Sequence, residues 1–466
     1  MYCTIFVVTF GSIDTGRLFV VVNYCILKSG RVRSACRAGV KHLDKVYVGL
    51  LGYGNVGQGV YRILTENCGD IRHKENLEIQ VKKILVRDLK KPRKGVDMSL
   101  LTDDYHDILD DPEITVIAEF MGSAEPALTY ALAALAKGKS FVTANKELLA
   151  THWHRLDRAA RENGTGLYYE GSVAGGIPII KTINDSLQGN NIASVMGIIN
   201  GTTNYILTGM TQQGESFAEA LQEAQRLGLA EPDPTYDVEG LDAVYKLSIL
   251  ASLAFHARVP VDRIYHEGIT QVGIDDIRNA DELGYVIKLL AMGKKSGTSI
   301  EARVHPTMIP KNHPLAAVNG AFNAIFMHGD AAGDLMLYGN GAGGMPTASA
   351  VVSDIITASQ ECHKYTTFYN GDQPAEEVRF VTDWESEYYI RLSASDRPGV
   401  LAQLAGVFGK YGVNIAYVKQ QRRDGGMAPV TFVTYLAREK ALRSAIDEIE
   451  KLPGVAKVEN VIRMEN

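Results

Sequence analysis

The chain has 466 residues, of which 46% are hydrophobic and 22% are charged, and its formal net charge is −6. This composition is typical of a globular protein of about three domains, and it excludes the strongly basic surface of many nucleic-acid-binding proteins. The five cysteines (Cys3, Cys25, Cys36, Cys68 and Cys362) have no metal-ligand spacing and predict reduced thiols in a cytoplasmic protein.

Residues 1–44 are expected to form an extension outside the fold. Their two apolar runs, 4–10 and 18–27, are each shorter than a membrane span of about 20 residues. The first four residues carry no positive charge, which a secretory signal peptide would have. Two interpretations stay open, a mis-assigned start and an unusual targeting peptide, and no membrane partner is expected.

The apolar run 46–51 has the length of a strand, and Gly52-Tyr53-Gly54-Asn55-Val56-Gly57 follows it before a helical pattern. G-x-G-x-x-G between a strand and a helix predicts a Rossmann-type site for a dinucleotide, with Gly52, Gly54, Asn55, Val56 and Gly57 in contact with the cofactor. The glycines permit a tight turn, close approach of a pyrophosphate and close helix packing. A glycine-rich turn in another α/β protein is the alternative.

The strand expected at 79–86 ends beside Arg87 and Asp88, where a Rossmann-type site meets the adenosine ribose. An acidic residue at this place favours NAD, and an arginine accommodates the 2′-phosphate of NADP. Because Arg87 comes first and a basic cluster follows at 90–94, we predict NADP as cofactor, with NAD tolerated. A solvated basic loop is the alternative.

A buried strand at 116–122 and a helix at 125–137 lead to a short strand that ends just before Lys146. The carboxyl end of a parallel strand lies at the ligand-binding edge of its sheet. Lys146 is therefore a candidate site residue, and a surface lysine at the start of a helix is the alternative.

The segment 224–246 is rich in acidic residues and ends in a lysine. Pro232 and Pro234 exclude a helix from its first half, and an apolar helix is expected at 241–255. On that helix Asp242 and Lys246 are four residues apart and share a face. A lysine held by a carboxylate among apolar residues can give a proton to a developing alkoxide. A solvated acidic loop with an ordinary ion pair is the alternative.

The pattern A-x-x-x-G-L-A-x-x-D-P-x-x-D-x-x-G-x-D-x-x-x-K across 224–246 resembles the signature segment of homoserine dehydrogenases. That family reduces L-aspartate 4-semialdehyde to L-homoserine, in threonine, methionine and isoleucine biosynthesis, with a nicotinamide cofactor. The resemblance implies that Lys246 donates the proton while Asp242 orients it. It also implies that Glu231 holds the substrate ammonium and that Asp237 lines the same pocket.

The same resemblance implies roles for residues in three other turns. Lys146, in an Ala-Asn-Lys turn, is expected beside the nicotinamide and the substrate. Thr202, where a helix opens after the strand 192–200, is expected near the substrate. Gly343, in a second glycine-rich loop at 339–348, is expected near the nicotinamide, although a hinge loop is also open.

The turn at 168–178 consists largely of small residues, so it can act only through its backbone. The resemblance implies a structural sodium ion held by the carbonyls of Glu170, Val173, Gly175 and Ile177. Hard cations prefer such oxygen ligands. The residues by themselves do not distinguish this site from a plain tight turn.

After a connector at 364–384, the strand and helix patterns follow the order βαββαβ of a ferredoxin-like domain. With Asp-Arg-Pro-Gly before its first helix, 385–466 resembles an ACT domain. This implies an amino-acid effector, with threonine expected, at Asp396, Gly399, Asn414 and Ile415. A domain that only holds the oligomer together is the alternative.

The predicted fold is α/β. A Rossmann-type NAD(P)-binding domain spans 45–170 with a return segment around 340–363, and an α+β catalytic and dimerisation domain spans 171–339. A connector at 364–384 joins them to the ferredoxin-like ACT regulatory domain. We predict a homodimer or higher oligomer without nucleic-acid partners. The alternatives are another ACT-regulated NAD(P)-dependent oxidoreductase and a non-catalytic amino-acid sensor.

Overall fold

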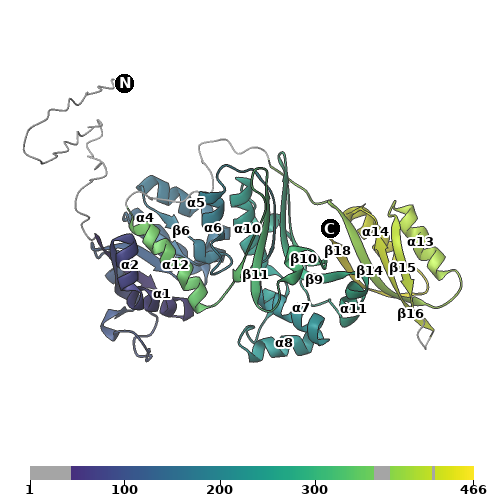
Figure 1. Cartoon of the computed structure of the whole chain (residues 1–466), viewed down its shortest axis with the longest axis horizontal. Coiled ribbons are helices and arrows are strands. Elements are labelled where there is room, and N and C mark those ends of the chain that lie inside the picture. The colour runs from purple at the N-terminus through teal and green to yellow at the C-terminus, as the bar shows by residue number, and fades with distance from the viewer. Residues whose placement is uncertain (1–43, 361–377, 422–425, 466) are drawn as a thin grey trace, which may run out of the picture. The chain divides into compact units, whose positions relative to one another are not determined.

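Two sheets organise the computed structural model, which describes residues 44–360, 378–421 and 426–465 (Figure 1). These residues belong to one unit, Asp44–Asn466. The extension predicted at 1–44 lies outside the described residues apart from Asp44, as does most of the predicted connector. Within the described residues, no helix is both long enough and apolar enough to cross a membrane.

The first sheet, with its helices, is called the N-terminal domain. Its six strands are all parallel, in the order β3-β2-β1-β4-β5-β6, which is the Rossmann order. The strands are β1 (Asp44–Leu51), β2 (Leu77–Leu85), β3 (Leu101–Thr102), β4 (Ile114–Glu119), β5 (Ser140–Thr143) and β6 (Leu167–Tyr168). The helices are α1 (Asn55–Glu66), α2 (Cys68–Glu75), α3 (His106–Leu109), α4 (Ala124–Ala136), α5 (Lys146–Asn163) and the returning α12 (Gly344–Ser359).

Helix α12 packs closely against α1, although the two helices lie far apart in the sequence (Figure 1). A Cβ atom at Gly59 would lie 2.7 Å from the Cβ of Ala348, so only glycine allows this approach. Helix α12, which lies within the return segment predicted around 340–363, therefore packs on the N-terminal domain.

The central domain contains the first part of a larger, mixed sheet, in the order β12-β11-β7-β9-β10. The strands are β7 (Ile192–Ile198), β8 (Tyr265–His266), β9 (Tyr285–Ser296), β10 (Ser299–Pro310), β11 (Phe322–Gly329), β12 (Gly333–Asn340) and β13 (Arg379–Phe380). The helices are α6 (Ile179–Lys181), α7 (Gly201–Gln213), α8 (Phe217–Arg226), α9 (Thr235–Val238), α10 (Leu241–Phe255) and α11 (Ile274–Leu283).

Helix α10 is almost entirely buried, as its apolar run predicts. It contacts β7, β9 and β10 on the central sheet and α5 of the N-terminal domain. The helix that carries Asp242 and Lys246 therefore lies where the two domains meet.

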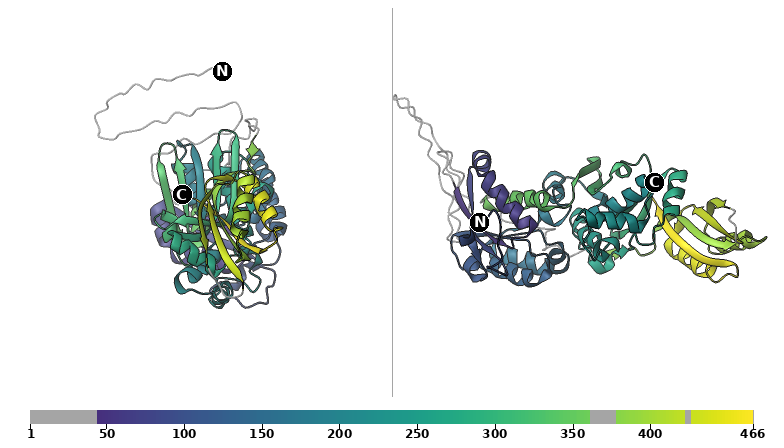
Figure 2. Two further views of the ribbon diagram at one scale, coloured as in Figure 1. Left: turned by 90° about the vertical axis from the view of Figure 1, so that its right-hand side faces the viewer. Right: turned by 90° about the horizontal axis from the view of Figure 1, so that it is seen from below.

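The C-terminal domain confirms the predicted βαββαβ order. Its elements are β14 (Glu385–Ser395), α13 (Val400–Lys410), β15 (Ile415–Gln420), β16 (Met427–Thr434), β17 (Ala437–Arg438), α14 (Glu439–Ile449) and β18 (Val455–Met464). The sheet order is β18-β14-β16-β15, and β14 and β18 run side by side at the yellow end of the ribbon (Figure 2).

Strand β18 also pairs with β10, so the C-terminal sheet continues the central sheet. This parallel pairing joins Thr307 to Arg463 and Met308 to Met464. The Arg463 side chain is 1% exposed and lies between Glu267 of the central domain and Glu439 of α14. A buried cation with one carboxylate from each domain fixes how these two domains meet.

A second buried contact joins the same two domains through Asp276, near the start of α11. Its carboxylate accepts hydrogen bonds from Arg391 Nε at 2.6 Å, Tyr389 Oη at 3.0 Å and Asn460 Nδ2 at 2.9 Å. Asp276 is fully buried, so these donors replace the water that the carboxylate would otherwise bind.

Two features of the central domain were not expected from the sequence. A short helix, α9, begins directly after Pro234, between the non-helical stretch expected around the prolines and the helix expected at 241–255. Strand β9 was not predicted, because its residues Ile287–Met292 are buried on both faces and show no alternation.

We predict that Asp276→Ala lowers the free energy of unfolding by about 3–5 kcal/mol, because Arg391 would lose its buried partner. Urea unfolding of the whole chain measures this loss. Arg62→Ala, which removes an exposed ion pair with Glu66, is the control and should change the free energy by about 0.5 kcal/mol or less. Equal effects of the two substitutions would contradict the anchoring role of Asp276.

Candidate active site

Asp242, in the first turn of α10, lies between two lysines. Its Oδ1 is 2.9 Å from Nζ of Lys146, and its Oδ2 is 2.7 Å from Nζ of Lys246. Lys146 is the first residue of α5 in the N-terminal domain, whereas Lys246 lies one turn further along α10. One carboxylate therefore holds two cations that come from different domains.

The two lysines determine the charge of Asp242. Burial by itself raises the pKa of the Asp242 carboxyl, but the charges of Lys246 and Lys146 outweigh burial and hold this pKa well below its usual range. Burial lowers the pKa of Lys146, yet the charge of Asp242 offsets this and leaves that pKa above its ordinary value. Asp242 is therefore ionised, and Lys146 is protonated, at neutral pH.

Asn200 connects this group to a second carboxylate. Its Nδ2 donates to Asp242 Oδ2 at 2.8 Å and to Asp237 Oδ1 at 2.7 Å, while its Oδ1 caps the first turn of α7 by accepting from Thr203 N. Burial and the nearby charge of Asp242 raise the pKa of Asp237. The sequence analysis missed Asn200, although asparagine before Gly201-Thr202 is a recognisable N-cap.

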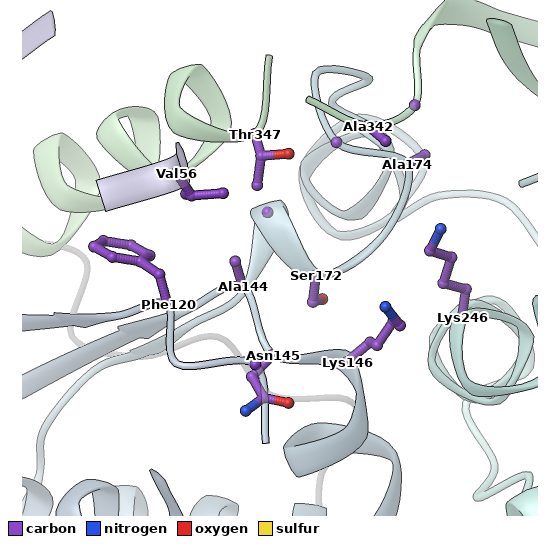
Figure 3. Close-up of a pocket in the computed structure, with 14 residues that line it drawn as sticks. Val56, Phe120, Ala144, Asn145, Lys146, Ser172, Ala174, Lys246, Ala342 and Thr347 are labelled. Carbon is purple, nitrogen blue, oxygen red and sulfur yellow. The ribbon is translucent and has the colours of Figure 1, made fainter. Parts of the chain in front are cut away.

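Among the described residues, Lys246 has two hydrogen-bond partners, which leaves one ammonium hydrogen for a ligand. Its Nζ donates to Asp242 and, at 2.8 Å, to the carbonyl of Ile199, and an ammonium has three donors. In Figure 3, Lys146 and Lys246 extend from different helices into the same space beside Ser172 and Ala174. Two cations thus face one cleft at the domain junction.

The cleft has a volume of about 210 Å³ and joins these lysines to the predicted dinucleotide turn. Its wall contains four residues that the sequence analysis singled out: Val56, Lys146, Gly175 and Lys246. Phe120 and Gly122 follow β4, and Gly341 and Ala342 belong to the loop before α12 (Figure 3). The cleft therefore lies at the carboxyl ends of the parallel strands, where Rossmann sheets bind ligands.

The predicted G-x-G-x-x-G turn has the required backbone. Gly52 has φ +109, and a Cβ at Gly57 would lie 2.5 Å from the Gly52 carbonyl oxygen. Space is open beside Gly54, where a Cβ would meet nothing within 4 Å. Asn55 is the first residue of α1, so the helix N-terminus faces this open space. Gly343, with φ +119, directly precedes α12 but does not line the cleft.

Arg87 and Asp88 follow β2 and are exposed, as expected for residues that meet a ribose. Asp88 Oδ1 accepts from Lys90 N at 2.8 Å, and the Asp88 carbonyl accepts from Arg93 at 2.7 Å. Asp88 thus stabilises its own loop. Within the described residues, the guanidinium of Arg87 makes no hydrogen bond.

The turn after Glu170 is buried and has two consecutive left-handed residues, Ala174 with φ 55 and Gly175 with φ 51. The Glu170 carboxylate accepts from the backbone N–H groups of Ile180 and Lys181, at 2.9 and 2.8 Å. The backbone near α6 thus holds the Glu170 side chain, and the Glu170 carbonyl is a further oxygen in this turn. The carbonyl of Ile177 already accepts from Ile179 N at 2.8 Å, which leaves its second lone pair. Carbonyl oxygens of this kind fit a hard monovalent cation.

Two predicted substrate residues lie apart from the lysines. Glu231 is exposed in the loop before α9, and its side chain makes no hydrogen bond within the described residues. The Thr202 hydroxyl donates to the Leu229 carbonyl at 2.8 Å, so it joins α7 to that same loop. Neither residue lines the cleft.

The predicted effector residues lie in two loops of the C-terminal domain. Gly399, with φ +91, precedes α13, and Asp396 Oδ1 accepts from Gln420 Nε2 at 3.1 Å. The carbonyl of Asn414 accepts from Tyr435 N at 2.9 Å, and Ile415 begins β15.

Comparisons with known proteins cover most of the chain. The family model described as homoserine dehydrogenase matches residues 178–356, its NAD-binding domain matches 52–170, and the ACT domain matches 388–454. The homoserine dehydrogenase of Corynebacterium glutamicum is 42% identical, over 90% of this chain and 96% of its own length.

Two solved structures give the same result. A homoserine dehydrogenase from Thiobacillus denitrificans superposes with a TM-score of 0.85 and 40% identity, covering 91% of this chain and 99% of the other. A hyperthermophilic archaeal homoserine dehydrogenase in complex with NADPH has a TM-score of 0.57 and 29% identity, covering 68% of this chain and 98% of its own.

We predict that Asp242→Asn lowers the free energy of unfolding at pH 7 by about 3–5 kcal/mol, because two lysines would lose their shared buried partner. The pKa of Asp242 is lower in the folded chain than its unfolded value of about 3.9. Its contribution is therefore present above pH of about 4 and is lost as the pH falls through the folded value.

Thermal unfolding of both proteins between pH 7 and pH 3 measures this dependence. The difference between them should shrink below pH of about 4. Asp110→Asn, which alters an exposed ion pair with Lys137, is the control and should have little effect at any pH. A difference that is constant with pH would show that the charge of Asp242 is not what stabilises the fold.

Proposed function

The chain belongs to the homoserine dehydrogenases, which are NAD(P)-dependent oxidoreductases, and on this basis we propose which of its residues perform the reaction. Lys246 protonates the oxygen of L-aspartate 4-semialdehyde, and Asp242 orients Lys246. The observation that carries the proposal is the Lys146–Asp242–Lys246 bridge beside the dinucleotide cleft.

A nicotinamide bound in the cleft supplies the hydride, which adds to the aldehyde carbon. Negative charge then develops on the aldehyde oxygen, and the free ammonium hydrogen of Lys246 moves to it, giving an alcohol. Asp242 keeps that ammonium aimed at the cleft through its hydrogen bond of 2.7 Å. Lys146 adds a second positive charge that stabilises the developing alkoxide.

The remaining substrate contacts are proposed around the same group. Lys146 contacts the substrate beside the nicotinamide, Asp237 lines the same pocket, and Glu231 binds the substrate ammonium from the loop before α9. The N-terminus of α7 at Thr202 offers backbone donors to the carboxylate. Asn200 supports this arrangement, because it links Asp237 to Asp242 and is the N-cap of α7.

We propose NADP as the preferred cofactor, with NAD tolerated. Arg87 lies just after β2, and its guanidinium makes no hydrogen bond to the described residues. The carboxylate of Asp88, in contrast, accepts a hydrogen bond from Lys90 N in its own loop. An arginine at this place accommodates a 2′-phosphate. The archaeal relative in complex with NADPH supports the same preference.

We also propose a structural sodium ion on the carbonyls of Glu170, Val173, Gly175 and Ile177. The buried turn and its two left-handed residues support a site built from backbone oxygens. Loss of thermal stability when N-methylglucamine replaces sodium tests the proposal, and equal stability in both salts would end it.

A homodimer is proposed through the edge of the central sheet. The side chains of Phe322, Met336 and Tyr338 are exposed on β11 and β12, and the rings of Phe322 and Tyr338 stack at 5.1 Å. An exposed aromatic patch beside an edge strand is suited to burial against a second copy. The mass of the chain in solution tests this, and a monomeric mass would refute it.

For regulation, we propose feedback inhibition by L-threonine through the ACT domain, at the loops of Asp396 and Gly399 and of Asn414 and Ile415. The pairing of β18 with β10 supports transmission, because it connects the ACT sheet to the sheet on which α10 packs. Threonine must bind the less active arrangement more tightly for inhibition to follow.

We predict that Lys246→Ala lowers kcat by about 10²–10⁴-fold, the range for loss of a general acid, while NADPH binds with near-normal affinity. The assay is NADPH oxidation that depends on L-aspartate 4-semialdehyde, with fluorescence titration for binding. Lys137→Ala is the control and should keep wild-type kcat, because Lys137 is an exposed lysine directly after α4. More than half of the wild-type rate in Lys246→Ala would refute the assignment.

We predict that Arg87→Ala raises the KM for NADPH by about 10- to 100-fold, the value of a lost charged hydrogen bond, and barely changes the KM for NADH. Steady-state kinetics with each cofactor measure the two constants. Arg62→Ala, an exposed arginine on α1, is the matched control. If Arg87→Ala raised both constants equally, Arg87 would not contact the 2′-phosphate.

A further inference from the structure

A second cavity lies between α11 of the central domain and the ACT sheet, away from the dinucleotide cleft. It has a volume of about 150 Å³. One wall is formed by four residues of α11: Asp275, Arg278, Asn279 and Glu282. The other wall is formed by residues of β14, β15 and β16 and the loop between the last two: Arg391, Lys419, Gln421, Pro429 and Thr431.

The side chains of the cavity have donors and acceptors that the described residues leave unused. Arg391 donates hydrogen bonds from Nε and Nη2 to Asp276, and its Nη1 makes no hydrogen bond within the described residues. Asn279 donates to Tyr389 at 2.9 Å and to Thr431 at 3.5 Å, while its Oδ1 accepts nothing from them. A guanidinium donor, an amide acceptor and the hydroxyl of Thr431 therefore face one small space.

The charges around the cavity balance. Three basic side chains line it: Arg278, Arg391 and Lys419. Two carboxylates, Asp275 and Glu282, also line it, and a third, Asp276, pairs with Arg391 behind the wall. A ligand with a net charge would therefore gain from one set and lose to the other. A zwitterion, with one group of each sign, can use both sets.

The volume suits a small ligand. A space of about 150 Å³ accommodates a molecule of about the size of benzene. An α-amino acid with a short side chain is of this size.

We infer that this cavity binds a small, free α-amino acid. Lys419 and Glu282 already pair with each other across the cavity, and each keeps further donor or acceptor sites. The ligand carboxylate pairs with Arg391 Nη1 and Lys419, and its ammonium with Asn279 Oδ1 and Glu282. Its side chain lies against Pro429 and Thr431. The site is distinct from the two effector loops proposed above, since none of their residues lines the cavity.

A ligand here would touch both the central domain and the ACT domain, so its affinity depends on how the two meet. Helix α11 also packs on β9 and α7, and α7 begins at Asn200 beside the active site. Amino-acid binding in the cavity therefore favours one arrangement of the active-site elements over another. This regulatory consequence rests on the proposed feedback inhibition, whereas the binding site does not.

Calorimetric titration of the full chain with glycine, L-alanine, L-serine and L-threonine tests the site. At least one of the four should bind, and Lys419→Gln should weaken that binding by about 10- to 100-fold, the effect of losing one charged hydrogen bond. Thr431→Val should weaken L-serine and L-threonine more than L-alanine. L-Threoninamide lacks the carboxylate charge, and N-acetyl-L-threonine lacks the ammonium charge. The affinity of the unsubstituted chain for either compound should be no higher than the affinity of the Lys419→Gln chain for L-threonine.

Two substitutions serve as controls. Lys419→Arg keeps the charge and should keep the binding. Lys410→Gln removes an exposed lysine that pairs with Glu448 on the helical side of the same domain, and it should change nothing. Absence of binding by all four amino acids, or wild-type affinity in Lys419→Gln, would overturn the inference.

Inhibition assays on the same proteins separate this site from the feedback proposal. If Asn414→Ala abolishes inhibition while Lys419→Gln alters neither binding nor inhibition, the cavity is refuted and feedback through the loops stands. If no amino acid inhibits but binding depends on Lys419, the feedback proposal is refuted and the cavity stands.

Discussion

The candidate active site depends on one carboxylate, Asp242, that pairs with two lysines from two domains. Asp242 is buried, and burial alone would disfavour its charge, yet Lys146 and Lys246 hold it ionised. Helix α10 packs on the central sheet and on α5, and this position brings Asp242 to Lys146. The contact between the two domains and the ion pairs of both lysines therefore depend on the same carboxylate.

The ACT domain is attached by backbone pairing as well as by side chains. Strand β18 closes the ACT sheet against β14 and also pairs with β10, so a shift of the ACT sheet must strain or move the central sheet. The buried Arg463, held by Glu267 and Glu439, opposes separation at this place. This junction supports the proposed transmission from the ACT domain to the central domain.

Local sequence signals predicted the fold because they depend on residues close in the chain. The strand–glycine–helix pattern at 46–57 and the helix at 241–255 were correct, and the βαββαβ order was correct. Strand β9 was missed because a strand buried on both faces has no alternation. The bridge from Lys146 to Asp242 could not be predicted, since it joins residues that meet only after the domains pack. Asn200 was missed although its N-cap position could be recognised, because its bonds to Asp237 and Asp242 join segments distant in the sequence.

At both domain junctions, a buried aspartate pairs with a basic side chain of the neighbouring domain. At the cleft Asp242 holds Lys146 across the junction, and at the ACT junction Asp276 holds Arg391. A buried ion pair contributes little net stability, but losing one partner is costly, so each pair specifies how its domains meet. In each case one donor stays unused by the described residues, a hydrogen on Lys246 and Nη1 on Arg391. The charged side chains that hold two domains together therefore also keep a hydrogen-bond donor for a ligand bound at that junction.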